Sequence, residues 1–451
     1  MSEFAWRAFY DGVVTPLMAV GMRVGALVDD KARDVSAGQR RAEADLTEQL
    51  ADLADSAPDR AALPGMWLHA TSVGEFEQAK PILRELWPTT RIAVTCFSPS
   101  VYNGMLRYPH KDLATYLPLD SRRNVARFFD LIRPTALVFS KFDIWPNCVW
   151  EARRRDIPCA LIAGTMHSTS RRLRVGIRGL LRHVHGHLAL QCAVGEEDAE
   201  RLRQLCGPEG NVVVTGDTRF DQVVERSEDA PPLPDVLPRW SDFCVVAGST
   251  YAPDEEALIP AFVKLRESVP NARLVLVPHE PEAPRLADAE KRMAAHGLRW
   301  ERLSALDEGA TADDLDAVLI DRIGLLASLY TMGRVAFVGG SFNYRVHNVM
   351  EPAVHGLPVV FGPLMDNAPE AYGLMEAGGA RRVGDADELA ENLVELAQTP
   401  STADTSTAAA SAARTMGAAA REYVLSNLGA SRRTLDALRE TVLPPSVGES
   451  P

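Results

Sequence analysis

Short apolar runs of strand length alternate with segments of helical period along most of this chain, and the alternation occurs in two separate series. Such a rhythm is typical of βαβ units, which build a parallel sheet covered by helices. Glu75–Leu86 and Asn124–Leu131 are two of the predicted helices. The predicted strands of the first series are Met66–Ala70, Arg91–Thr95, Ala136–Phe139, Cys159–Ala163, Leu188–Val194 and Asn211–Thr215; those of the second are Phe243–Ala247, Leu274–Val277, Ala317–Ile320, Val335–Val338 and Pro358–Phe361.

Between the two series, Ser227–Trp240 holds four prolines and no hydrophobic period, which is typical of a linker. A chain of 451 residues is also too long for one ordinary core. We therefore predict two Rossmann-like domains, residues 41–226 and 241–430, behind an N-terminal segment of residues 1–40. Two such domains would place a cleft between the carboxyl ends of their sheets, where ligands of parallel α/β sheets bind.

The composition excludes several kinds of partner. A formal net charge of -13 disfavours nucleic acid. The six cysteines form no CxxC pair, which argues against a zinc site and for a reducing compartment. His183, His185 and His187 alternate and would face one way on a strand, but no carboxylate lies near them in sequence, so no metal site is expected.

Two segments are candidates for contact with a membrane. Gly12–Met22 is uncharged and mostly apolar, but Arg23 interrupts the run, and a spanning helix needs about 20 apolar residues. The sequence allows two interpretations of this segment: a helix that lies in the membrane interface and a helix that packs on the protein. Ser170–Val184 predicts a helix with an apolar stripe and an arginine stripe, which would either bind an anionic surface or pack on the first domain. The arginine stripe consists of Arg174, Arg178 and Arg182.

Three polar motifs directly follow predicted strands in the first half. Ser72-Val-Gly-Glu75 is a capping box by its spacing, and Glu75 is equally a candidate general base at a cleft. Lys141 and Asp143 would face the same way in an extended chain, as a surface ion pair or as cleft residues. Arg219 would either meet negative charge in the cleft or pair with a neighbouring aspartate.

The second half carries the candidate phosphate-binding residues. Val338 runs into Gly339-Gly340-Ser341, and a helix with Asn348 and Glu351 in its first turn follows, so backbone N–H groups and the positive helix end would seat a phosphate. Glu351 would close a capping box or accept ribose hydroxyls. Ser249 follows another strand as a helix cap, and His279-Glu280 follows a third.

Taken in order, these motifs resemble the transferases of 3-deoxy-D-manno-octulosonic acid (Kdo) that act in lipopolysaccharide assembly. The resemblance runs from about Met66 to Arg382, and each piece is short. The matching pieces are Ser72-Val-Gly-Glu75, Tyr116-Leu-Pro-Leu-Asp120, Trp145-Pro-Asn147, Gly216-Asp-Thr-Arg-Phe-Asp221, Ser249-Thr250, Pro278-His-Glu280, Asp321-Arg-Ile-Gly-Leu-Leu326, Gly339-Gly-Ser341, His347-Asn348, Glu351-Pro352 and Phe361-Gly-Pro363.

The resemblance implies an inverting enzyme of the GT-B fold, α/β with two Rossmann-like domains facing each other across a cleft. It implies CMP-Kdo as donor, a lipid A precursor as acceptor, no metal or other cofactor at the transfer site, and a place on the cytoplasmic face of the inner membrane. Glu75 matches the family's base, Lys141 and Asp143 take the positions of two glutamates, and Arg219 takes that of a cation that stabilises the transition state. Donor contacts fall on Ser249, His279, Glu280, Ile323, Gly324, Leu325, Ser341, His347, Asn348, Val349, Met350 and Glu351.

The chain departs from the family pattern around the donor. Pro278-His279-Glu280 stands where Pro-Arg-His is commoner, which removes an arginine expected to face phosphate. Lys141 replaces the first acid of a Glu-x-Glu pair, and Val346, beside Arg345, stands where a glycine is usual. Two other readings fit the same motifs: a GT-B transferase or epimerase acting on a UDP-sugar, and a non-catalytic binder of sugar nucleotides that kept the fold.

Overall fold

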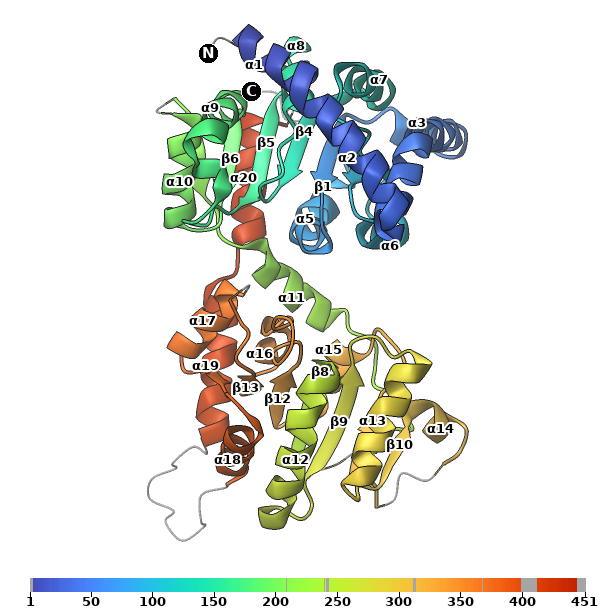
Figure 1. Cartoon of the computed structure of the whole chain (residues 1–451), viewed down its shortest axis with the longest axis vertical. Coiled ribbons are helices and arrows are strands. Elements are labelled where there is room, and N and C mark those ends of the chain that lie inside the picture. The colour runs from blue at the N-terminus through green and yellow to red at the C-terminus, as the bar shows by residue number, and fades with distance from the viewer. Residues whose placement is uncertain are drawn as a thin grey trace. The chain divides into compact units, whose positions relative to one another are not determined.

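The computed structural model describes residues 3–207, 209–238, 240, 243–310, 314–366, 368–398 and 412–443. The chain divides into two compact units, the first formed by Met1–Gln222 together with Gly429–Pro451 and the second by Val223–Leu428. Each unit contains a seven-stranded sheet whose neighbouring strands all pair in parallel (Figure 1). The two series of βαβ units predicted from the sequence are therefore confirmed.

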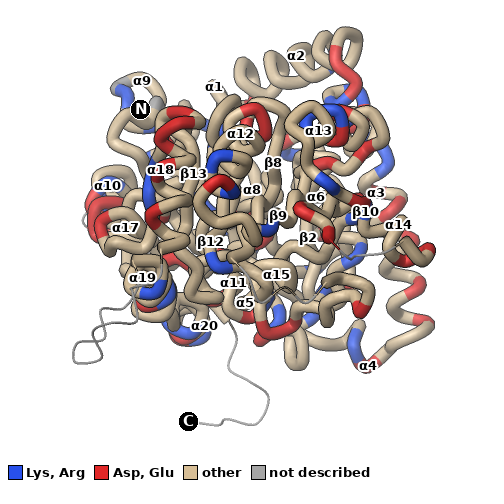
Figure 2. The backbone as a smooth tube through the Cα atoms, turned by 90° about the horizontal axis from the view of Figure 1, so that it is seen from below, with Lys and Arg blue, Asp and Glu red and all other residues tan. Residues whose placement is uncertain are grey.

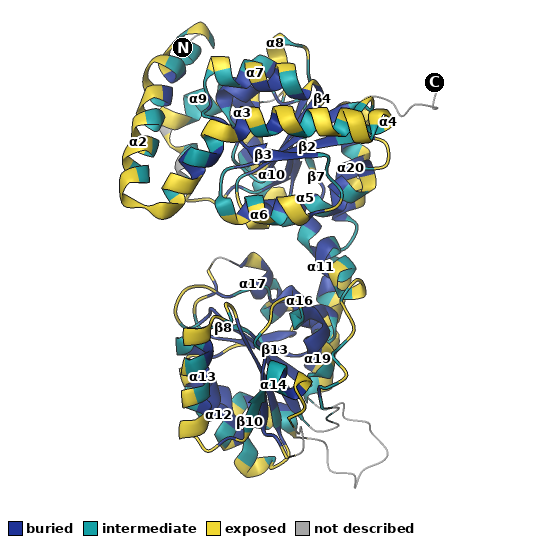
Figure 3. Ribbon diagram, turned by 90° about the vertical axis from the view of Figure 1, so that its right-hand side faces the viewer, coloured by how far each residue is buried: buried dark blue, intermediate teal, exposed yellow. Residues whose placement is uncertain are grey.

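In the first unit the strand order is β3-β2-β1-β4-β5-β6-β7. Its central strands are buried along their whole length because helices cover both faces of a parallel sheet (Figure 3). The strands are β1 (Gly65–Ala70), β2 (Arg91–Cys96), β3 (Leu113–Tyr116), β4 (Pro134–Ser140), β5 (Cys159–Gly164), β6 (Leu190–Ala193) and β7 (Val212–Val214). The helices between them are α3 (Asp30–Ser56), α4 (Pro58–Ala61), α5 (Val73–Leu86), α6 (Pro99–Arg107), α7 (Arg122–Ile132), α8 (Pro146–Arg154), α9 (Val175–His185), α10 (Glu196–Cys206) and α11 (Thr218–Glu228).

In the second unit the strand order is β10-β11-β9-β8-β12-β13-β14. The strands are β8 (Cys244–Thr250), β9 (Arg273–Pro278), β10 (Trp300–Arg302), β11 (Ala317–Leu319), β12 (Val335–Val338), β13 (Val359–Phe361) and β14 (Ala380–Arg382). The helices are α12 (Ala252–Ser268), α13 (Ala283–Ala295), α14 (Leu303–Asp307), α15 (Leu326–Leu329), α16 (Met350–Val354), α17 (Pro369–Glu376), α18 (Ala386–Ala397) and α19 (Ala412–Ser426). The segment predicted to be a linker packs on this unit in part, since Leu237 is buried and Trp240 lies against the same core cluster.

The C-terminal helix α20 (Ala430–Thr441) returns to the first unit, beyond the end of the predicted second domain. Leu435 and Leu438 join the core of that unit. Both oxygens of the Asp221 carboxylate accept backbone hydrogen bonds at the start of α20, from the N–H groups of Gly429 at 2.7 Å and Ser431 at 2.6 Å. A carboxylate at a helix N-terminus satisfies donors that the helix leaves unpaired.

The N-terminus forms one continuous helical segment, Glu3–Val28, with a π-helical turn, η1 (Tyr10–Val14), between α1 (Glu3–Phe9) and α2 (Thr15–Val28). By length and composition alone, this segment is long and apolar enough to cross a membrane. Only 6% of its most apolar stretch of 18 residues is buried in the protein. Leu17 and Leu27 are 66% and 78% exposed, and α2 carries almost no charge in Figure 2. The sequence left two alternatives for this segment, an interfacial helix and a helix that packs on the protein. The exposed apolar side chains of α2 do not fit extensive packing on the protein.

One polar cluster attaches the N-terminal helix to the first unit. The hydroxyl of Tyr10, in the π-helical turn, donates to the buried carboxylate of Asp120 at 2.9 Å. The same carboxylate accepts the N–H of Asn147 at 3.1 Å, and the Asn147 amide donates to Asp11 at 2.9 Å. Burial raises the pKa of Asp120 to about 6. The family-like motifs that end at Asp120 and Asn147 therefore serve, in this structure, to hold the N-terminal helix.

The predicted basic helix Ser170–Val184 begins later than expected. A 3-10 turn, η2 (Arg171–Leu173), precedes α9, which starts at Val175 and contains both Gly176 and Gly179. Leu180, Leu181 and Val184 pack on the first unit's core, while Ile177 is 49% exposed. The predicted strand with alternating histidines is wrong: His183 and His185 lie in α9, and strand β6 starts at Leu190.

Candidate active site

Glu75 lies just past the carboxyl end of β1, an interior strand of the first sheet. It opens α5 directly after β1, whose neighbours β2 and β4 continue the sheet in opposite directions, which is the switch point where ligands of such sheets bind. Its carboxylate accepts the N–H of Thr71 at 2.7 Å and the hydroxyl of Ser72 at 3.1 Å. The Ser72 hydroxyl also accepts the N–H of Glu75 at 3.4 Å, so Ser72 caps α5 as its spacing predicts. The reciprocal bond of a capping box goes to Thr71 N–H in place of Ser72 N–H.

The environment of Glu75 raises the pKa of its carboxyl. Burial is the main cause, since the residue is 2% exposed, and the charge of Asp143 adds to it, while the bonds from Thr71 and Ser72 and the charge of Lys141 act in the opposite direction. A carboxylate whose pKa is moved toward neutrality is a better proton acceptor for a hydroxyl. Capping and base chemistry are therefore compatible at this residue.

Lys141 and Asp143 occupy the turn after β4, beside the first turn of α5. The expectation of an extended chain here is wrong, because Lys141 has a φ of 70° in the left-handed region. Asp143 pairs instead with Arg172, whose Nη2 lies 2.6 Å from its Oδ1. The Arg172 guanidinium also lies 4.5 Å from the ring centre of Phe142. Arg172 was not singled out at this site from the sequence; its only sequence signal was its place in the arginine run near Ser170.

Arg219 is held close to α5 by a buried aspartate. Its side chain donates to Asp217 Oδ2 from Nε at 2.9 Å and from Nη2 at 2.7 Å. Asp217 also accepts from the Gln78 amide, one helical turn after Glu75, at 3.2 Å. The pairing of Arg219 with a neighbouring aspartate, one of the two alternatives from the sequence, is what the structure contains.

A buried imidazole links the loops after β1 and β4. His69 Nε2 accepts from the Trp145 indole at 3.0 Å, and His69 Nδ1 lies 3.0 Å from the Thr95 hydroxyl. Burial lowers the pKa of His69 to about 3, so this ring is neutral at physiological pH. The Trp145-Pro-Asn147 motif thus fixes the loop that carries Asp143.

In the second unit the Gly-Gly turn after β12 is closed by a buried carboxylate. Asp254, in the first turn of α12, accepts the N–H of Gly340 at 2.7 Å and that of Phe342 at 3.1 Å. The hydroxyl of Ser341 is fully buried and lies between Val338 and Gly362. The N–H groups of Gly340 and Phe342 are therefore bonded to Asp254, and the phosphate seat at the start of the following helix stays a prediction. Both glycines of the turn are required for packing. A Cβ on Gly339 would lie 2.4 Å from the Ser249 carbonyl oxygen.

Three rings stack at the ends of the adjacent strands β9, β8 and β12. The ring centres of His279 and His347 are 4.2 Å apart, and those of Tyr251 and His347 are 5.6 Å apart. Burial and the neighbouring His279 lower the pKa of His347 to about 4. Its buried Nε2 has no hydrogen-bond partner among the described residues. The three rings therefore form one aromatic cluster at the carboxyl ends of these strands.

The helix after the Gly-Gly turn is shorter than predicted and begins at Met350. The side chain of Asn348 accepts the Met350 N–H at 3.0 Å, so Asn348 still caps it. Glu351 Oε1 accepts from Arg226 Nη1 at 3.0 Å and lies 3.4 Å from the Asn348 amide nitrogen. The other predicted donor contacts differ in exposure and backbone conformation. Val349 is buried, Glu280 is exposed and Ile323 is 77% exposed. Ser249 has a φ of 56°, Gly324 has a φ of 91°, and Leu325 precedes α15.

One group of possible metal ligands lies away from both clusters. Glu3, His183 and His187 bring ligand atoms within 4.8 Å of one another. Arg153 already lies among them, with its Nη1 3.0 Å from Glu3 Oε2 and within hydrogen-bond distance of the His187 ring. A guanidinium at the centre repels a metal ion, so this cluster is better described as an ionic contact between α1 and α8–α9.

The sequence of the first unit and that of the whole chain match known transferases. Residues 39–222 match the family described as 3-deoxy-D-manno-octulosonic-acid transferase (kdotransferase). The enzyme of that name from Aquifex aeolicus is 28% identical over 334 residues, 73% of this chain and 85% of that protein. The one from Bordetella pertussis is 28% identical over 407 residues, 85% of this chain and 89% of that protein.

The chain is therefore similar to the Kdo transferases over most of its length. Solved structures agree on the fold. The UDP-GlcNAc 2-epimerase from Neisseria meningitidis superposes with a TM-score of 0.57 at 14% identity, covering 84% of this chain and 100% of that one. MurG from Acinetobacter baumannii superposes with a TM-score of 0.52 at 13% identity over the same shares. The two parallel sheets of this Kdo transferase relative thus form a fold of the GT-B type.

Proposed function

We propose that this protein is an inverting glycosyltransferase that moves Kdo from CMP-Kdo to a hydroxyl of a lipid A precursor. The observation that carries the proposal is Glu75, a buried carboxylate of raised pKa at the switch point of a unit that matches the Kdo transferase family. The order of motifs through both units and the family relatives support Kdo as the sugar. CMP-Kdo and the lipid acceptor follow from the resemblance.

The transfer needs one base and a stabilised leaving group. The acceptor oxygen attacks the anomeric carbon of Kdo, the bond from that carbon to the phosphate oxygen breaks, and CMP leaves with both electrons of that bond. Glu75 takes the proton of the acceptor hydroxyl. Negative charge then collects on a single phosphate group, where a nearby cation stabilises it.

The second unit offers the surface for CMP. The stack of Tyr251, His347 and His279 suits a nucleoside, and His347 is neutral, so it offers a ring nitrogen without a charge. Arg345 lies on the loop between the Gly-Gly turn and His347, with its guanidinium 4.5 Å from the ring centre of Tyr344. We assign to Arg345 the phosphate contact that the missing family arginine would make, because Arg219 is already paired with Asp217.

Two measurements test the donor and the reaction. CMP should raise the melting temperature of the protein more than UMP or UDP does at equal concentration. Purified protein given CMP-Kdo and a lipid A precursor in detergent micelles should release CMP and add Kdo to the lipid. A larger shift with UDP, and no transfer from CMP-Kdo, would favour the alternative of a GT-B enzyme acting on a UDP-sugar.

We also propose that the protein works at the cytoplasmic face of the inner membrane, bound to an anionic surface through the helix Glu3–Val28. The exposed apolar side chains of α2 support this, since isolated apolar faces of this length bind interfaces. Replacing Leu17 and Val24 with Gln should reduce sedimentation with anionic vesicles and leave CMP binding unchanged. The control variant is Leu425→Gln, an exposed leucine in the second unit. Equal sedimentation of all three proteins would refute the proposal.

A further inference from the structure

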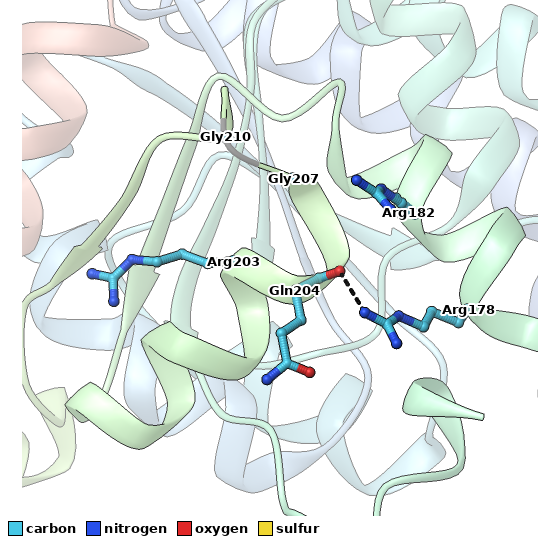
Figure 4. A pocket seen from close by; sticks show the side chains of 6 residues that line it. All are labelled: Arg178, Arg182, Arg203, Gln204, Gly207 and Gly210. Atoms are coloured by element: carbon cyan, nitrogen blue, oxygen red, sulfur yellow. Dashed lines mark hydrogen bonds between the residues drawn. The ribbon is translucent and has the colours of Figure 1, made fainter. Parts of the chain in front are cut away.

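A hollow lined by arginines lies between α9 and the carboxyl end of α10 in the first unit (Figure 4). Its volume is about 360 Å³, within the range of roughly 300–1,000 Å³ typical of ligand pockets. Among the residues that the structure describes, its lining contains no acidic side chain and consists of Arg178, Arg182, Arg203, Gln204, Gly207 and Gly210. The hollow lies apart from the residues assigned to sugar transfer, so the inference goes beyond the proposed function.

The three arginines are not equivalent. Arg203 is bound to Glu196 at 2.6 Å and extends away from the other two in Figure 4. Arg178 donates to the Gln204 carbonyl oxygen at 3.5 Å, the outer limit of a hydrogen bond. Arg182 has no hydrogen bond or ion pair from its guanidinium to any residue that the structure describes. Two guanidinium groups therefore enter the hollow with most of their donors unused.

Two glycines lie beside these arginines. Gly207 ends α10 with a φ of 83°, and a Cβ there would lie 3.5 Å from Arg182 Nη2. Gly210 leaves no space for a side chain, because a Cβ on it would lie 2.2 Å from Cys206 Sγ. Arg178 and Arg182 are one helical turn apart, so both guanidinium forks point to the same side of α9.

Capping of α10 explains only part of this arrangement. Cations near the carboxyl end of a helix are favourable, and the contact of Arg178 with Gln204 fits that role. Arg182 makes no such contact with a described residue. Two forked guanidinium groups without a carboxylate match the oxygens of a phosphate with two free charges.

The position of α9 favours a lipid as the source of that phosphate. A Cβ on Gly179 would lie 2.7 Å from the Trp6 ring, so α9 seats the N-terminal helix. That helix exposes Phe4 at 81% and a long apolar face beyond it. We propose that Arg178 and Arg182 form a binding site for the phosphomonoester headgroup of a membrane lipid, next to the helix that meets the membrane.

The full-length protein tests the site by vesicle sedimentation. Vesicles of phosphatidylcholine with phosphatidate are compared with vesicles of phosphatidylcholine with phosphatidylserine at equal surface charge. The parent should prefer phosphatidate, and the double variant R178Q/R182Q should lose that preference, with a fall in affinity for phosphatidate vesicles of about 30-fold for two cations. The variant R203Q is the matched control, since its guanidinium lines the same hollow but is already paired; it should keep the preference.

Two further variants and a titration with phosphate complete the test. If the double variant loses stability, R182Q alone takes its place, because Arg182 makes no contact that folding needs among the described residues. R182K should restore only part of the preference, since an ammonium lacks the fork. Calorimetric titration with inorganic phosphate distinguishes the source: if free phosphate binds the parent and abolishes its preference for phosphatidate, the lipid assignment is overturned. No preference in the parent, or an unchanged preference in R178Q/R182Q, overturns the site itself.

Discussion

Replacing Glu75 with Gln separates a catalytic base from a helix cap. In the structure Glu75 accepts from the Thr71 N–H at 2.7 Å and from the Ser72 hydroxyl at 3.1 Å. An amide of the same shape accepts from Thr71 through its oxygen and donates to the Ser72 oxygen through its nitrogen. Both hydrogen bonds therefore survive in Glu75→Gln, and only their charge is lost.

The expected change in stability is small. A hydrogen bond to a charged group contributes about 1.5–3 kcal/mol and a neutral one about 0.5–1.5 kcal/mol. The raised pKa of Glu75 means that burial already disfavours the charged form, which offsets part of that difference. We expect a loss below about 1 kcal/mol, or a fall of roughly 2–4 °C in melting temperature for a unit of this size.

The expected change in turnover is large. Loss of a general base lowers the rate by about 10²–10⁴-fold. The matched control is Ser72→Ala, which removes the cap, at a cost of about 0.5–2 kcal/mol, and keeps the carboxylate. CMP release from CMP-Kdo, measured with a lipid A precursor in micelles, should be lost in Glu75→Gln and kept in Ser72→Ala, with CMP binding intact in both. Near-normal turnover of a folded Glu75→Gln variant would refute the mechanism.

Three further results are expected. Asn348→Ala and Glu351→Ala should each lower the calorimetric affinity for CMP by a larger factor than they raise the apparent KM for the acceptor. Unchanged CMP affinity in both variants would move the donor site elsewhere. The Asp120 carboxyl has a pKa of about 6 in the folded protein and about 3.8 in the unfolded chain. Its contribution to the free energy of unfolding is therefore complete below about pH 4 and is lost as the pH rises through 6. The total change is at most about 3 kcal/mol. Urea unfolding of the parent relative to Asp120→Asn should follow that slope, and a pH-independent difference would contradict it. Tyr10→Phe should cost about 1–3 kcal/mol and make the N-terminal helix accessible to proteolysis, which the matched variant Phe9→Tyr, in the preceding position, should not do.

The interior strands could be predicted because burial on both faces leaves a continuous apolar run. Strands β1, β5 and β12 are of this kind, and their predicted limits are close to the observed ones. Strands β3, β10 and β14, which lie at edges of the two sheets, were missed. Each has only three or four residues, and β10 and β14 also contain arginine, so they give little periodic signal.

The candidate site could be predicted only where its contacts are local. The cap that the Ser72 hydroxyl makes on the Glu75 N–H follows from a spacing of three residues. The partner of Asp143 is 29 residues away, and Asp254 is 86 residues from the Gly340 N–H that it binds. Neither distance leaves a pattern in the sequence, so the sequence did not predict that a buried carboxylate closes the Gly-Gly turn.

The return of α20 makes the first unit discontinuous in sequence. Residues 39–222 match the family, yet Leu435, Leu438 and the bonds of Asp221 to Gly429 and Ser431 complete the core and cap of that unit. On the ribosome, the first unit therefore waits for the second to be synthesised before its last helix emerges. A stop codon near the end of the gene would leave the whole second unit intact and still expose apolar core of the first unit. Late truncations should therefore behave as folding defects of the first unit.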